Sequence, residues 1–145
     1  MADLDLGTIT EGRELPTFER EGTLLHWARY AAVNPVHIVG HHLDDEVARY
    51  EGFDRAFIMA PLEHAYAHAM LRNWMGARGR VSSLDIRLRR PLLRGRTLTA
   101  GGTVTSVQRE SDRVVVGIDI WERDDLGELL APGRAEVVVP LDGAG

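Results

Sequence analysis

The second half of the chain consists of short segments in which apolar and polar residues alternate, and this pattern limits the possible folds most strongly. In residues 81–89, every second residue from 84 onward is apolar and the residues between them are charged, as in a strand with one buried face. Three more strand-like segments follow, at residues 97–107, 113–123 and 128–141. Only a few residues, mostly polar or glycine, join these three segments. Such short connections favour antiparallel hairpins. We expect Pro132 and Gly133 to interrupt the last strand, which leaves residues 135–139 as its apolar part.

The segment before these strands has the spacing of an α-helix. Residues 61–75 read PLEHAYAHAMLRNWM, and Pro61 suits the first helical position. Small and apolar residues recur at helical spacing, at Leu62, Ala65, Tyr66, Ala69, Met70, Asn73 and Trp74. The many alanines indicate that other elements pack closely around this helix. We therefore predict an α+β fold in which an antiparallel β-sheet wraps around a central α-helix at about residues 61–75.

Two shorter helices are expected nearer the N-terminus. Residues 23–32 form the first, with Thr23 as its N-cap. Residues 44–50 form the second, which begins with acidic side chains that suit the positive end of the helix dipole. Asp44 is read as the N-cap of this helix, and Gly52 as its C-terminal stop.

Composition excludes several classes of function. The chain has 145 residues, 44% of them hydrophobic and 27% charged, which fits one ordinary domain over residues 1–145. A net charge of −5 does not favour a nucleic acid as partner. With no cysteine, the chain has no disulfide, thiolate nucleophile or cysteine-based zinc site. The acidic first sixteen residues lack the apolar core of a signal peptide, and no apolar run is long enough for a membrane span, so we expect a cytoplasmic protein.

The stretch HLDDEVARYEGF, residues 42–53, is the most distinctive in the chain. It resembles the second half of the motif of MaoC-like dehydratases, the (R)-specific enoyl-CoA hydratases, in which histidine, aspartate, alanine, glycine and phenylalanine occur at the same spacing. Residues 58–61, 73–76 and 88–104 resemble further stretches of that family, the second of them as in single-domain actinobacterial members. The resemblance covers about residues 12–141 and implies a hot-dog fold.

In the first half of the family motif, this chain departs from the family's residues. With His42 in register, the position of the family's catalytic aspartate falls on His37. A second register aligns Asn34, Pro35 and His37 with the family's Asn-Pro-x-His, but it also lacks the aspartate. The catalytic pair of the family is therefore incomplete in this sequence.

The resemblance implies a water molecule held between two proton-transfer groups, for which the candidates are His42 and His37. It also implies a backbone N–H at the start of the central helix that receives the enolate oxygen. Pro61 has no N–H, so this donor is expected at Leu62 or Glu63. The residues expected to bind substrate are Leu62, Glu63, His64, Asn34 and Arg90.

No metal and no cofactor are expected. His64 and His68 have the i, i+4 spacing of zinc ligands, but the glutamate that follows the first histidine of a zinc-protease helix is missing. We interpret one of them as lining the substrate tunnel, because the central helix borders this tunnel in hot-dog proteins.

Five arginines cluster between the first strand-like segment and the second, at Arg87, Arg89, Arg90, Arg94 and Arg96. One interpretation is a solvated sheet face. The other is contact with the phosphates of coenzyme A or of a carrier protein's phosphopantetheine arm.

The favoured function is (R)-specific hydration or dehydration of a 2-enoyl or 3-hydroxyacyl thioester of coenzyme A or acyl carrier protein. A bulky acyl group, as in steroid breakdown or polyketide tailoring, is one expectation for the substrate. One alternative is a degenerate or repurposed subunit that lacks the family aspartate and works with a partner chain. Another is an acyl thioesterase, for which Glu63 is the carboxylate on the central helix. The resemblance also implies a homodimer, or a hetero-oligomer with a second hot-dog chain.

Overall fold

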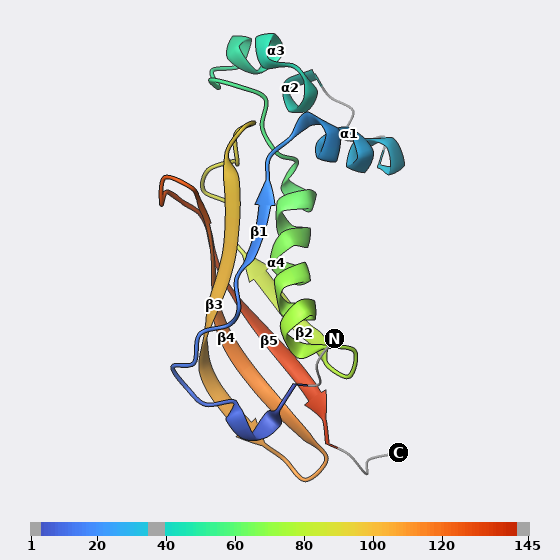
Figure 1. Ribbon diagram of the computed structural model, residues 1–145, viewed down its shortest axis with the longest axis vertical. Helices are drawn as coiled ribbons and strands as arrows, with labels where there is room; N and C mark the ends of the chain where they lie inside the picture. The colour runs from blue at the N-terminus through green and yellow to red at the C-terminus, as the bar shows by residue number, and fades with distance from the viewer. Residues whose placement is uncertain (1–3, 35–39, 142–145) are drawn as a thin grey trace.

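The computed structural model describes residues 4–34 and 40–141, and its main element is an antiparallel sheet. In sheet order, the strands are β1 (Phe18–Glu21), β3 (Thr97–Arg109), β4 (Arg113–Asp124), β5 (Leu129–Pro140) and β2 (Arg80–Ile86). The helix α4 (Ala60–Met75) runs along one face of the curled sheet (Figure 1). The predicted α+β fold with a helix wrapped by an antiparallel sheet is confirmed. Pro61 is the second residue of α4, one position later than expected.

Alternation along the strands builds the core between the sheet and α4. In β4, the buried positions are every second residue, at Val114, Val116, Ile118, Ile120 and Glu122. The first four are apolar and pack in the same hydrophobic cluster as the buried residues of α4. Such two-residue periodicity is what a sheet with one covered face requires. Glu122 is the exception, since it places a carboxyl group in the core.

Pro132 and Gly133 do not interrupt the last strand, which corrects the prediction. Both lie inside β5 and remain in register with β4, where Pro132 is opposite Trp121. The carbonyl oxygen of Pro132 accepts a hydrogen bond from the N–H of Arg87 at 2.9 Å, beyond the last paired residue of β2. Pro132 therefore lies just beyond the end of the edge strand β2. Because no residue of β2 is paired with it there, the missing N–H costs little.

The buried face of α4 differs in part from the predicted one. Ala65 and Asn73, which the spacing placed inside, are exposed. Glu63, Ala67 and Leu71 are buried instead. The helix buries a stripe that is wide enough to include neighbouring rows of side chains.

Three further helices lie together beyond one end of the sheet (Figure 1): α1 (Leu24–Val33), α2 (Gly40–Leu43) and α3 (Asp45–Tyr50). Both predicted caps are confirmed, because Thr23 Oγ1 accepts from the N–H of His26 and Asp44 Oδ1 from that of Glu46. A short 3-10 turn, η1 (Leu6–Thr8), precedes β1. No helix in the described part of the chain is long and apolar enough to cross a membrane.

Asp45 ties this helical group to the segment that joins β2 to β3. Its carboxylate is paired with Arg94 and accepts a hydrogen bond from the N–H of Ala56 at 2.9 Å. The hydrogen bond from Arg94 is the main reason that the pKa of Asp45 falls to about 2. This carboxylate therefore stays charged at neutral pH and holds α3, and with it the neighbouring α2, in a fixed position.

Candidate active site

A cavity of about 350 Å³ lies where α2, the start of α4 and the segment after β2 meet. Its lining is mostly apolar, with four ionisable side chains. The lining residues are His42, Phe53, Phe57, Ile58, Ala60, Pro61, Glu63, Leu88, Arg89, Arg90 and Pro91. Three residues predicted for the site, His42, Glu63 and Arg90, are thus brought together from elements far apart in the sequence.

The imidazole of His42 is held in one orientation. His42 is 8% exposed, and its Nδ1 lies 2.9 Å from the carbonyl oxygen of Phe57. Because a carbonyl oxygen only accepts, Nδ1 carries the proton of this hydrogen bond. Proton transfer at His42 is therefore assigned to Nε2.

His41 extends this arrangement toward solvent. Its Nε2 lies 3.2 Å from Nε2 of His42, and its Nδ1 lies 2.8 Å from a carboxylate oxygen of Glu51. The ring of Phe57 stacks on His41 with 4.9 Å between centroids. The two rings thus make three polar contacts: His42 with the Phe57 carbonyl, His42 with His41, and His41 with Glu51. All three are hydrogen bonds only when the rings carry three N–H protons, whereas two neutral rings carry two. The pair is thus suited to hold one extra proton, with Glu51 balancing its charge.

Glu63 is the carboxyl group in the cavity wall. It is 1% exposed, and its Oε1 has no hydrogen-bond partner among the described residues. Burial raises the pKa of Glu63 to about 7, because a charged carboxylate is poorly solvated there. At neutral pH this group can therefore both give and accept a proton.

The expected oxyanion donors are already occupied, which contradicts that expectation. The N–H groups of Leu62 and Glu63 both donate to the carbonyl oxygen of Met59, at 2.9 and 3.1 Å. The side chain of Leu62 is buried in the core. Ala60, the first residue of α4, lines the cavity, and its N–H has no hydrogen bond to any residue that the structure describes. Ala60 is therefore the better candidate for this donor.

The remaining predicted residues lie elsewhere. His37 lies outside the described residues. Asn34 ends α1, where its side-chain amide donates to the carbonyl of Tyr30 at 3.1 Å, and it does not line the cavity. His64 and His68 line a neighbouring apolar groove between α4 and β2. Within residues 4–34 and 40–141, no group of three histidine or acidic residues is close enough to hold a metal ion.

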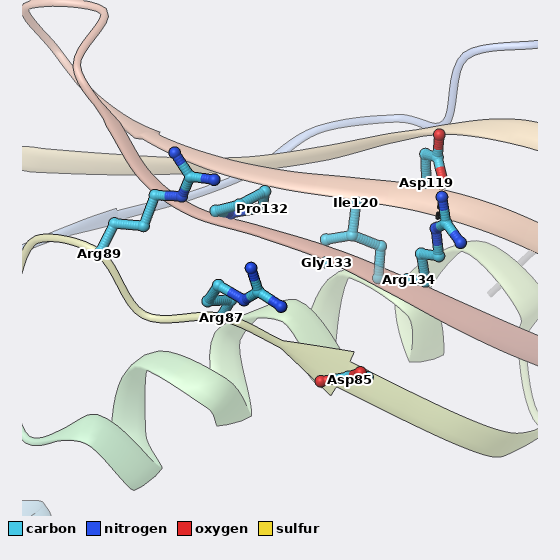
Figure 2. A pocket seen from close by; sticks show the side chains of 8 residues that line it. All are labelled: Asp85, Arg87, Arg89, Asp119, Ile120, Pro132, Gly133 and Arg134. Atoms are coloured by element: carbon cyan, nitrogen blue, oxygen red, sulfur yellow. Dashed lines mark ion pairs between the residues drawn. The ribbon is translucent and has the colours of Figure 1, made fainter.

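The arginine cluster divides between two roles. Arg94 pairs with Asp45, and Arg96 pairs with two aspartates of the β4–β5 hairpin, so these two stabilise the fold. Arg87 and Arg89 make no ion pair with a described residue. Both project over the outer face of the sheet, where a cavity of about 420 Å³ also contains Arg134 (Figure 2).

Arg89 is shared between this outer cavity and the one that contains His42. Arg90 also lines the His42 cavity and pairs with Glu128 at 2.7 Å, with both side chains exposed. Arg89 and Arg90 thus lie where a ligand could pass from the buried site to the outer surface.

Two residues of interest were not predicted. His41 stands next to His42 in the sequence, and only its contacts reveal its role. Glu122 could have been found from the alternation of β4, since it continues the apolar face of Val116, Ile118 and Ile120.

The chain is similar in structure to several solved proteins. An (R)-hydratase from A. caviae involved in PHA biosynthesis matches with a TM-score of 0.81 and 20% identity, over 92% of this chain and 98% of that one. A chain of the ChsH1-ChsH2 complex from Mycobacterium tuberculosis matches with a TM-score of 0.79 and 20% identity, over 91% of this chain and 99% of that one. A MaoC-like dehydratase from Rhodospirillum rubrum matches with a TM-score of 0.79 and 19% identity, over 93% and 95% of the two chains.

These similarities establish the hot-dog fold of the MaoC-like dehydratases, as the sequence predicted. No protein-family model matches the chain, and no curated protein sequence is significantly similar to it.

Proposed function

We propose that the chain is a MaoC-like hydratase that catalyses (R)-specific addition of water to a 2-enoyl thioester, and the reverse dehydration. The observation that carries this proposal is the fixed imidazole of His42 in the wall of a largely apolar cavity at the start of α4. An apolar cavity with a few ionisable groups suits an acyl chain whose reactive end needs acid–base catalysis. The hot-dog hydratases with similar structures support the same reaction class.

In the proposed reaction, water takes the place of the contact of His42 Nε2 with His41, gives this nitrogen a proton, and attacks C3 of the enoyl group through its oxygen. The Glu51 carboxylate, which contacts His41, then balances the positive charge that forms on the imidazole pair. Electron density from the double bond moves to the thioester oxygen, which the N–H of Ala60 stabilises. Proton delivery to C2 completes the addition. His37, at the position of the family aspartate, remains a second candidate for proton transfer.

Binding of a charged thioester is assigned to Arg89 and Arg90. They lie between the cavity and the outer face of the sheet, where the phosphates of coenzyme A or of a phosphopantetheine arm would emerge. We expect the double variant Arg89→Gln/Arg90→Gln to raise KM for an enoyl-CoA by about three- to tenfold with little change in kcat. The variant Arg113→Gln, on the hairpin of β3 and β4 at the opposite end of the sheet, serves as control. An unchanged KM would exclude the two arginines from thioester binding.

We further propose that a second hot-dog subunit, either a copy of this chain or a different one, pairs with β2. This strand is one of the two edges of the sheet, and the groove beside it is lined by apolar residues of β2 and the segment after it and by alanines, a proline and two histidines of α4. Leu84, Ile86 and Leu88 lie along this groove. The ChsH1-ChsH2 complex among the similar structures agrees with such an assembly.

Leu84→Glu is expected to dissociate this assembly, because it places a charge in the proposed apolar contact. The molar mass of the purified protein, measured by light scattering, checks the result. Leu126→Glu, in an exposed hairpin, is the matched control and should leave the mass unchanged. A wild-type mass equal to one chain, with no partner, would contradict the proposed pairing.

A thioesterase is the second candidate, because Glu63 lies on the central helix and lines the same cavity as His42. One assay separates the possibilities: the purified protein is mixed with crotonyl-CoA or a bulkier enoyl-CoA, and both enoyl absorbance and free coenzyme A are followed. Loss of enoyl absorbance without free coenzyme A supports the hydratase. Release of coenzyme A supports the thioesterase, and absence of both reactions supports a repurposed subunit.

A further inference from the structure

Two carboxyl groups are buried in the core, near enough for the charge of one to act on the other, and the reaction described so far uses neither. Glu122 points inward from β4 and is 0% exposed, while Glu63 points inward from α4 and is 1% exposed. Neither oxygen of Glu122 has a hydrogen-bond partner in the described part of the chain, and the same holds for Oε1 of Glu63. Buried carboxyl groups without a partner are costly, so their presence in an otherwise apolar core calls for a functional reason.

The surroundings of the pair favour its protonated form. Burial, and second the nearby charge of Glu63, raise the pKa of Glu122 to about 8. The N–H of Ala67 favours the charged form slightly, without the geometry of a hydrogen bond. Near pH 7, Glu122 therefore keeps its proton, while Glu63 exchanges its own.

Several other ionisable groups border the pair. His42 from α2 and Arg89 and Arg90 after β2 line the cavity that Glu63 faces. Tyr66 is buried one turn along α4, and the charge of Arg20 on β1 acts on it. None of these makes an ion pair with Glu63 or Glu122 among the described residues.

We propose that Glu63 is the second proton-transfer residue of the cavity and that Glu122 is its positioning residue, whose negative charge, when it ionises, opposes the loss of the Glu63 proton. This inference rests on the proposed hydratase function. It assigns to Glu63 the role that an aspartate has in the family motif. Glu63 lies on α4, outside the segment that resembles this motif.

The resulting step is balanced in atoms and electrons. The water oxygen forms a bond to C3, and His42 takes one water proton. The double bond between C2 and C3 becomes an enolate, which collapses as C2 takes the proton from the Glu63 carboxyl group. The extra proton on the His41–His42 pair then returns through water to Glu63, so H and OH have been added and the enzyme is restored.

The isosteric variant Glu63→Gln tests the catalytic role. We expect kcat for crotonyl-CoA hydration to fall about 100- to 10,000-fold, with KM nearly unchanged. Glu63→Asp should restore part of the activity, and it serves as the second variant if the glutamine variant does not fold. Glu19→Gln, an exposed glutamate on β1, is the matched control.

Glu122→Gln tests the positioning role. Its amide cannot ionise, so Glu63 no longer loses its proton beside a second group that becomes negatively charged, and the pH above which hydration activity falls should move to a lower value. A purely structural role would leave this pH unchanged. Infrared spectra at pH 7 should show a protonated carboxyl band in the wild type that weakens in both glutamine variants.

Hydration by the wild type with full activity retained in Glu63→Gln would overturn this inference and leave the proposed function standing. If the pH above which hydration activity falls is the same in Glu122→Gln as in the wild type, the positioning role is overturned. A wild type that hydrates no enoyl thioester would instead contradict the proposed function, and the catalytic role of Glu63 with it.

Discussion

Replacing His42 with asparagine should lower kcat for enoyl-CoA hydration by roughly 100- to 10,000-fold, the range for loss of a general acid–base group. Asparagine has a side-chain amide that can reproduce the hydrogen bond from Nδ1 to the carbonyl of Phe57. It has no group that can reproduce proton transfer at Nε2. The variant therefore separates catalysis from the contact that holds α2 against the segment before α4.

The measurement is the steady-state rate with crotonyl-CoA, together with a thermal melt that checks folding. His26→Asn on α1 is the matched control, because His26 does not line the cavity and contacts the backbone of Glu21 instead. If the His42 variant melts like the wild type and retains its kcat, His42 is not the acid–base residue.

The stability of the protein should fall as the pH rises from about 5 to 8. Glu63 and Glu122 have folded-state pKa values of about 7 and 8, above the value of 4.5 for an unperturbed glutamate. The folded state therefore binds more protons than the unfolded state in this range, so raising the pH favours unfolding. Each group contributes at most about 1.4 kcal/mol per pH unit between its unfolded and folded pKa values. The stabilisation is complete below about pH 4.5 and is lost as the pH passes the folded pKa.

The free energy of unfolding in urea, measured at several pH values, checks this expectation. Glu122→Gln should flatten the decline, because its side chain does not ionise. Glu19→Gln should follow the wild-type curve. Asp45, whose pKa is lowered to about 2, loses its contribution only in acid, below the window measured here. A wild-type stability that stays constant from pH 5 to 8 would contradict the burial of the two carboxyl groups.

Much of the fold could be predicted because periodicity along the chain reflects which face is covered. The alternation in residues 81–89 placed Leu84 and Ile86 on the same face, and in the structure both line the groove beside α4. Periodicity failed where side chains are small or elements short. The alanines of α4 could not distinguish two adjacent rows, so Ala65 was assigned to the buried face. The four residues of β1 show no apolar alternation, and pairing with β3 alone makes them a strand.

The site could be predicted only where one local motif carries it. His42 and the cap at Asp44 follow from the stretch HLDDEVARYEGF, whose spacing is set by two adjoining helices. The proximity of Glu63 to Glu122 depends on how α4 lies on the sheet, because these residues are 59 positions apart in the sequence. The candidate oxyanion donor was also missed. The N–H groups of Leu62 and Glu63 are bonded to the carbonyl of Met59, and no sequence pattern reveals these hydrogen bonds.

The configuration of the product tests the central claim most directly. Crotonyl-CoA is incubated with the wild-type protein, and the resulting 3-hydroxybutyryl-CoA is analysed by chiral chromatography. The account predicts the (R) product alone, formed without release of coenzyme A and lost in His42→Asn. Formation of the (S) product, or of free coenzyme A without hydration, would contradict it.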